Sequence, residues 1–165
     1  EEFNIQPYGT EALSTLRIEM GHVAGPELDG RTIPYDVSLE GLVSKKKDFI
    51  GKRSLTRSDT VRDDRKQLVG IIPLNKSQFI EEGQHVVECE NLPNKIKTPV
   101  EYLGHISSSY HSPNLNHCIS MAMVKGGNKL MGKKLFVSTP KGTKNIPVEI
   151  VNPVFIDPEN KRLTS

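Results

Sequence analysis

The sequence predicts an α+β fold in which a short segment of helices and irregular chain precedes a small antiparallel β domain. Near the N-terminus, Leu13, Leu16 and Met20 recur at i, i+3 and i+7, the spacing of one face of an α-helix. In the last hundred or so residues, short apolar runs alternate with turn residues, which is typical of a small barrel or sandwich. The charged stretch at 57–66 separates the two regions, and we expect it to be a linker.

The first helix is predicted over residues 7–21, with Thr10 as its N-cap and Gly21 in the left-handed turn that often ends a helix. Glu19 then lies in the last helical turn, where its carboxylate faces the negative end of the helix dipole. That placement is unfavourable by a few tenths to about 1 kcal/mol. Two interpretations stay open: a surface carboxylate paired with a lysine or arginine, or a buried carboxylate that accepts hydrogen bonds from a ligand at a domain junction.

Three short elements are predicted between this helix and the charged stretch. Pro34 suits the first turn of a short helix. Residues 39–43 are short and apolar enough for a strand. Asp48 is the expected cap of a second small helix, FIGKRSLTR, whose Phe49 and Leu55 would point inward.

The rest of the chain is predicted to hold six β-strands, because six apolar runs are each bounded by turn-forming residues. The strands are expected at residues 67–74, 84–89, 100–107, 118–125, 134–138 and 146–151. The turns are expected at residues 82–83, 92–94, 112–114, 126–128 and 140–142.

Composition argues against several classes of function. The 22 basic and 20 acidic residues give a net charge of +2, which is too balanced to indicate nucleic-acid binding. No apolar run approaches the roughly 20 residues that span a membrane, and there is no signal peptide, so we expect a cytoplasmic protein with no membrane partner. Cys89 and Cys118 are expected to be idle thiols. Because the sequence opens without methionine, we expect it to be a fragment of a longer protein.

The candidates for metal or nucleophilic chemistry are weak. His105, His111 and His117 surround a serine-rich stretch that we expect to be a loop, and they lack the spacing of a metal site. The serines at 107–109 and Ser112 are not part of a G-x-S-x-G elbow, so we expect them to satisfy backbone groups near a turn. No phosphate-binding glycine loop is present either. We therefore expect no metal site and no hydrolase triad.

Basic residues gather at Lys45, Lys46 and Lys47, followed by Lys52 and Arg53. They form either a patch for an anionic ligand or a solvated loop, and the pattern leaves both open. Nucleic acid would favour aromatic residues interleaved with the basic ones, which the stretch largely lacks.

An ordered set of motifs resembles the glycine-cleavage T-protein, or aminomethyltransferase, family. Residues 8–30 resemble its L-R-x-E-x-G followed by G-x-E/D-x-D, and DFIGKRSL at 48–55 resembles D-F-I-G-[KR]-x-x-L. The stretches that resemble the family's carboxyl-terminal barrel are 66–71, 81–87, 104–115, 120–125 and 151–155. Within the family, PYGTEAL, GHISSSYHSPNL and DPENKRL are similar to one branch, the alpha subunits of heterotetrameric sarcosine oxidases, and the resemblance covers nearly the whole chain.

The resemblance implies a fold and a division into domains. Residues 1–60 would be the C-terminal piece of a folate-binding α/β domain. Residues 61–165 would be a six-stranded antiparallel barrel of Greek-key or jelly-roll-like character. The family's catalytic aspartate lies ahead of residue 1, so no catalytic residue is assigned, and we expect this chain alone to be inactive.

The resemblance also implies an activity. In that branch sarcosine is oxidised at a flavin on another subunit, and tetrahydrofolate captures the product as methylenetetrahydrofolate. Glu19 matches the glutamate that binds the pterin edge, Arg17 lies beside it in the motif, and Lys45 or Lys46 is similar in position to a basic residue that helps to hold folate. The implied partners are the other subunits, above all the flavin-bearing beta subunit, while FAD, FMN and NAD would bind elsewhere in the complex.

Two alternatives stay open beside this interpretation. One is a folate-dependent one-carbon transfer protein of the aminomethyltransferase kind, and the other is a non-catalytic module that braces the complex. The position of Glu19 distinguishes them, because a buried Glu19 beside a cleft favours folate and a solvated one favours bracing. The amine, whether sarcosine, dimethylglycine or another N-methyl amine, is left open.

Overall fold

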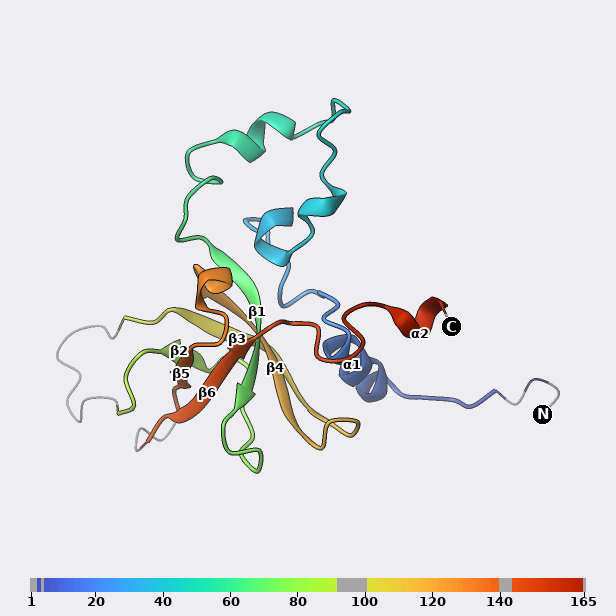
Figure 1. Ribbon diagram of the computed structural model, residues 1–165, viewed down its shortest axis with the longest axis vertical. Helices are drawn as coiled ribbons and strands as arrows, with labels where there is room; N and C mark the ends of the chain where they lie inside the picture. The colour runs from blue at the N-terminus through green and yellow to red at the C-terminus, as the bar shows by residue number, and fades with distance from the viewer. Residues whose placement is uncertain (1–2, 4, 92–100, 140–143, 165) are drawn as a thin grey trace.

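Six antiparallel strands close into a barrel in the computed structural model of the chain, which describes residues 3, 5–91, 101–139 and 144–164. The strands are β1 (Lys66–Pro73), β2 (His85–Val87), β3 (Gly104–Ser112), β4 (His117–Lys125), β5 (Lys134–Val137) and β6 (Ile146–Val151). Their order around the barrel is β1-β4-β3-β2-β5-β6 (Figure 1). The predicted six-stranded antiparallel barrel is confirmed, and its Greek-key or jelly-roll-like character stays a prediction.

The strand that differs most from expectation is β3. The prediction ended it at residue 107, but the strand continues through the serine-rich stretch to Ser112. The register with β4 shifts between Ile106 and Ser108, which marks a β-bulge. The predicted turns at 92–94 and 140–142 lie outside the described residues.

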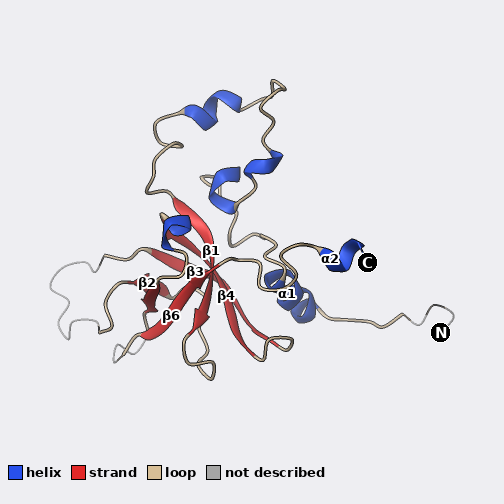
Figure 2. Ribbon diagram, viewed as in Figure 1, coloured by secondary structure: helices blue, strands red, loops and turns tan. Residues whose placement is uncertain are grey.

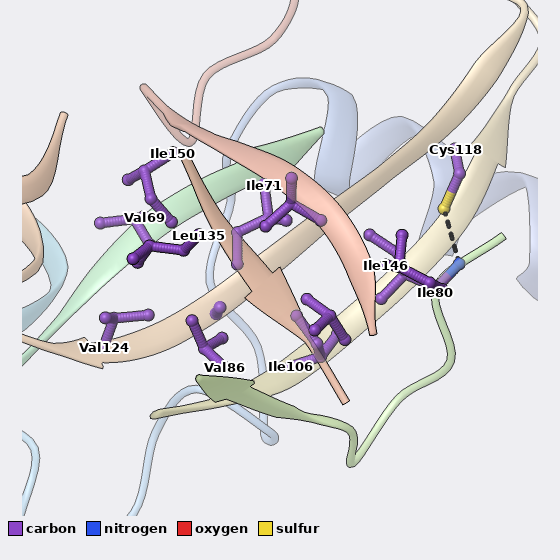
Figure 3. Packing of buried hydrophobic residues seen from close by; sticks show 13 residues of the cluster. Val69, Ile71, Ile80, Val86, Ile106, Cys118, Val124, Leu135, Ile146 and Ile150 are labelled. Carbon is purple, nitrogen blue, oxygen red and sulfur yellow. Dashed lines mark hydrogen bonds between the residues drawn. The ribbon is translucent and has the colours of Figure 1, made fainter. Parts of the chain in front are cut away.

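The interior of the barrel is filled by apolar side chains from all six strands (Figure 3). The buried cluster consists of Val69, Ile71, Ile80, Val86, Ile106, Cys118, Ala122, Val124, Leu135, Val137, Ile146, Val148 and Ile150. Cys118 is therefore buried, whereas Cys89 is exposed, and neither forms a disulfide. The backbone N–H of Ile80 donates to the Cys118 sulfur at 3.5 Å, the contact drawn in Figure 3.

A second apolar cluster lies on the outer face of the barrel, where α1 (Thr10–Glu19) packs against β3 and β4. Ile18 of the helix joins Leu68, Ile119, Met121 and Met123 in this cluster. Because β4 contacts the barrel interior on one face and α1 on the other, eight of its nine residues are buried. This two-sided burial explains the almost continuous apolar sequence of the strand.

The first helix is shorter than predicted and buries a different face. It begins at Thr10, and its N-cap is Gly9 rather than Thr10. Gly21 follows the helix with φ of 69°, the left-handed conformation that was predicted. Leu13 and Leu16 are about half exposed, so their apolar stripe is not the one that packs on the barrel. Only the last turn reaches the strands, and there Ile18 and Glu19 are buried.

The region between α1 and the barrel contains short 3-10 helices. The predicted helical turn at Pro34 is confirmed as η1 (Pro34–Val37). Residues 39–43 do not form a strand but η2 (Glu40–Leu42), since no neighbouring strand among the described residues pairs with them. The helix expected after Asp48 is reduced to η3 (Lys52–Thr56), and its N-cap is Gly51. These helices and α1 lie outside the ring of strands (Figure 2).

The charged stretch before β1 is mostly exposed, as expected of a connection, but one end of it is anchored. Arg65 Nε donates to Asp36 Oδ1 at 2.8 Å, and the side chains of both residues are largely buried. This ion pair joins the start of β1 to η1. The chain ends in α2 (Lys161–Thr164), which the sequence pattern did not predict. Within the described residues, no helix is long and apolar enough to cross a membrane.

Candidate functional site

Glu19 is buried at the end of α1, with 2% of its surface exposed. The Ser112 hydroxyl donates a hydrogen bond to Glu19 Oε1, and Asn114 Nδ2 donates to Glu19 Oε2 at 2.8 Å. Both donors are neutral and come from the end of β3 and the turn that follows it. The interpretation of Glu19 as a surface carboxylate paired with a lysine or arginine is therefore wrong.

The main chain at Glu19 is also held by a distant segment. The backbone N–H groups of Phe155 and Ile156 donate to the Glu19 carbonyl at 3.0 and 2.9 Å. The last carbonyls of a helix have no partner within the helix, so these bonds satisfy one of them. As a result, α1, the turn after β3 and the segment after β6 meet at Glu19.

Arg17 belongs to a separate network on the same helix. Its Nη1 donates to Glu27 Oε2 at 3.3 Å, and its Nη2 donates to the Ser108 hydroxyl at 2.6 Å. Ser108 in turn donates to Glu27 Oε1 at 2.6 Å, and the backbone N–H of Ala24 donates to Glu27 Oε2 at 2.8 Å. Glu27 and Ser108 are both buried. The guanidinium of Arg17 is thus engaged within the chain.

Sequence reasoning missed the four side chains that hold these two residues. Ser112 ends β3 and accepts from the Leu115 N–H, as expected of a serine near a turn, whereas Ser108 lies within the strand. Both also contact α1 side chains, which was not predicted. Ser112 and Asn114 belong to the S-P-x-L part of the family motif, and Glu27 to its G-x-E/D part, so the motifs contained a signal. The pairing itself is not local, because Ser112 is 93 residues from Glu19.

The structure does not bring the two predicted lysines to Glu19. Lys45 and Lys46 are exposed in the loop after η2, and no contact in the described chain joins them to Glu19. A cavity of about 500 Å³ lies beside that loop, lined by apolar side chains such as Phe49 and Ile50 and by Lys47.

A second cavity, of about 270 Å³, lies between the barrel and the segment after α1. It is lined by Glu27, His105 and Lys66 and by the ion pair of Arg65 with Asp36. Glu19 lines neither of these two cavities. The Arg17 network therefore borders the smaller cavity through Glu27, whereas Glu19 borders neither cavity, so neither of them is the cleft that would favour folate.

The serine-rich stretch between the three histidines, which was predicted to be a loop, is part of β3. His105 and His111 belong to β3, and His117 belongs to β4. His117 is buried, with Nδ1 2.9 Å from the Cys118 carbonyl, and His111 is exposed. Among the described residues, no group of three or more histidine, cysteine or acidic side chains is placed to hold a metal ion.

The lowered pKa of His105 predicts that the stability of the protein depends on pH. Burial lowers the pKa of His105 below its ordinary value of 6.5, and the charges of Lys66 and His85 lower it further. The unfolded chain then binds a proton at His105 more readily than the folded chain does. The contribution of His105 to the free energy of unfolding is therefore complete above pH 6.5 and is lost as the pH falls below it.

We expect the melting temperature of the wild type to fall more steeply than that of His105→Asn as the pH is lowered from about 8 to 5, the range in which histidine titrates. Circular dichroism melts across this range measure the difference. Parallel curves for the two proteins would contradict the assignment.

Comparison with known proteins identifies the fold family. Residues 66–157 match the model of the glycine cleavage T-protein C-terminal barrel domain. In fold, the chain is similar to the crystal structure of glycine cleavage system aminomethyltransferase T from Bartonella henselae, with a TM-score of 0.70 and 23% sequence identity. That match covers 88% of this chain and 38% of the other.

Curated relatives are similar over nearly the full chain. The sarcosine oxidase subunit alpha of Corynebacterium sp. (strain U-96) is 39% identical across 98% of this chain, and that of Rhizobium meliloti (strain 1021) is 37% identical across 99%. An aminomethyltransferase of Clostridium botulinum (strain Okra / Type B1) is 31% identical across 86%.

The chain spans only 16% of the length of the two sarcosine oxidase subunits and 36% of that of the aminomethyltransferase. The family that the motifs indicated, and its sarcosine oxidase branch, are thus confirmed as the proteins to which this chain is similar. Because the matched residues, 66–157, make up more than half of the chain and contain all six strands, the chain belongs to the glycine cleavage T-protein C-terminal barrel family.

Proposed function

We propose that this chain contributes a carboxylate, Glu19, to a tetrahydrofolate site in a protein that handles the one-carbon group of N-methyl amines. The observation that carries the proposal is the burial of Glu19 with one neutral donor on each of its oxygens. An ionised carboxylate has about four acceptor positions, so two of them are used by Ser112 and Asn114. The other two suit a ligand that presents two N–H donors side by side.

The donor edge of a pterin ring has this character, because an amino group and a ring N–H lie next to each other on it. Of the two features that would favour folate, burial is present, since Glu19 is 2% exposed, whereas the two cavities described above lie elsewhere. Hydrogen bonds between N–H donors and a charged acceptor are also about twice as strong as neutral ones.

We place the remaining predicted parts around this contact. Residues 1–60 would be the C-terminal piece of the folate-binding α/β domain, and residues 61–165 the barrel domain. Lys45 and Lys46, as exposed cations, would meet the anionic end of the folate. Arg17, whose guanidinium is bound by Glu27 and Ser108, would dock α1 on the barrel without contacting the folate, and the catalytic group would be supplied outside this sequence.

The relatives suggest the setting of this site. Those with the higher identities are alpha subunits of sarcosine oxidase, a component of an oxidoreductase with further subunits. We propose that this chain acts in such a cytoplasmic complex, next to a flavin-bearing beta subunit, so that an oxidised N-methyl group is captured as methylenetetrahydrofolate. FAD, FMN and NAD would be held by other parts of that complex.

A second candidate function is a module that braces the complex without binding folate. It is favoured by the fact that Glu19 and Arg17 are both tied to β3 by hydrogen bonds inside the chain. In that case both side chains serve to dock α1 on the barrel. The experiment that follows separates the two functions.

Replacing Glu19 by glutamine in the full-length protein should weaken tetrahydrofolate binding by 1.5–3 kcal/mol, or roughly 10- to 150-fold, because a charged acceptor is replaced by an amide that also presents N–H groups to the ligand. Calorimetric titration measures the affinity. Glu40→Gln, at an exposed position of η2, is the matched control and should bind like the wild type.

The same titration tests the bracing function. Urea unfolding of each variant is measured alongside, since Glu19→Gln also alters the contacts with Ser112 and Asn114. A loss of stability with unchanged folate affinity would reject the folate site and support bracing.

A further inference from the structure

We propose that Ser112 and Asn114 are positioning residues, which hold the Glu19 carboxylate in the one orientation that offers both remaining acceptor positions to the ligand. This inference rests on the proposed function. It assigns to the barrel, through the turn between β3 and β4, a direct part in ligand recognition by a residue of α1.

The turn after β3 holds the Ser112 side chain in place. The backbone N–H of Leu115 donates to the Ser112 hydroxyl oxygen at 3.0 Å, and the N–H of Asn116 donates to the Ser112 carbonyl at 2.8 Å. An ionised carboxylate has no proton to donate, so the Ser112 hydroxyl must be the donor in this contact, while its oxygen accepts from Leu115. Its proton therefore goes to Glu19 Oε1, and the turn keeps that donor in place.

Asn114 completes the arrangement from the other side of the carboxylate. Its amide Nδ2 donates to Glu19 Oε2 at 2.8 Å. With one donor on each of two equivalent oxygens, tilting the carboxylate plane about its last side-chain bond would weaken both hydrogen bonds. The plane of the carboxylate is thereby fixed before a ligand arrives, which reduces the entropy lost on binding.

The strand itself provides a matched control. Ser108 lies four residues before Ser112 on β3, is equally buried, and also contacts an α1 side chain through its hydroxyl. Its partners are Arg17 and Glu27, and it has no contact with Glu19. If these serines served only to dock the helix, removal of either hydroxyl would have the same consequence for ligand binding.

The test uses Ser112→Ala, Asn114→Leu and Ser108→Ala in the full-length protein, with tetrahydrofolate as the probe. We expect Ser112→Ala and Asn114→Leu each to weaken binding roughly tenfold, the loss expected for about one hydrogen bond to a charged group. Ser108→Ala should lower the stability to urea and leave the affinity unchanged. Ser112→Thr keeps the hydroxyl and should restore binding.

A double-mutant cycle shows whether the two residues act through Glu19. On a Glu19→Gln background, Ser112→Ala and Asn114→Leu should have almost no further effect on affinity, because residues in one network are not additive. Additive losses would overturn the positioning role. Asn114 is exposed and lies in the turn after β3, so its variant keeps the test valid if Ser112→Ala fails to fold.

The possible failures are distinguishable. If Glu19→Gln binds tetrahydrofolate like the wild type, the proposed function is wrong and this inference falls with it. If Glu19→Gln loses affinity while Ser112→Ala and Asn114→Leu bind normally, only the positioning role is overturned.

Discussion

Replacing Glu27 by alanine is expected to lower the free energy of unfolding by roughly 3–5 kcal/mol, the loss seen when one partner of a buried ion pair is removed. The Glu27 side chain is fully buried, and that of Arg17 is 18% exposed. The change leaves the Arg17 guanidinium without its carboxylate. It also leaves the Ser108 hydroxyl and the Ala24 N–H without their acceptor. Urea unfolding followed by circular dichroism measures the loss.

An exposed ion pair provides the control for this prediction. Lys129 Nζ lies 3.0 Å from Asp63 Oδ2, and both side chains are largely exposed. Exposed ion pairs contribute about 0–1 kcal/mol to the free energy of unfolding. Asp63→Ala should therefore lie within about 1 kcal/mol of the wild type. Equal effects of Glu27→Ala and Asp63→Ala would show that the Arg17 network contributes nothing particular to stability.

Replacing Ile71 by alanine is expected to destabilise the protein by about 2–5 kcal/mol, through lost burial and the cavity that remains. Ile71 is completely buried and lies on β1 between two neighbours, opposite Ser120 of β4 and Ile150 of β6. The closed barrel gives the surrounding side chains little room to collapse into the gap. We therefore expect the upper part of the range from urea unfolding.

Ile50 provides a comparison with the same chemistry at a different place. Its side chain is fully exposed in the loop before η3, so Ile50→Ala removes no buried contact. Its free energy of unfolding should lie within about 0.5 kcal/mol of that of the wild type. If Ile71→Ala had an equally small effect, the side chain could not be part of a packed barrel core.

The β domain could be predicted because its signals are local. Each strand except β3 lies within one or two residues of its predicted bounds, since each is a short apolar run bounded by turn residues. The error in β3 has a physical cause. Its serines look like loop residues, but their hydroxyls are satisfied inside the fold, for example by the bond from Ser109 to the Ile80 carbonyl at 2.6 Å.

The first sixty residues were predicted less well. Several of their apolar side chains are exposed in the described part of the chain, including those of Leu39 and Leu42. An apolar run such as 39–43 therefore does not show whether a strand or a helical turn forms. Leu13 and Leu16 show the same limit, because helical spacing identifies a stripe but not what the stripe contacts. The burial of Ile18 and Glu19 depends on where α1 meets the barrel.

By itself, the sequence determined the barrel and the family and singled out Glu19, because apolar runs and short motifs are properties of neighbouring positions. Only the tertiary structure decided that Glu19 is buried and what holds it. Its partners Ser112 and Asn114 lie 93 and 95 residues away, and no local pattern encodes such a contact. The unfavourable dipole at the end of α1 is offset by hydrogen bonds that form only when the helix docks on β3.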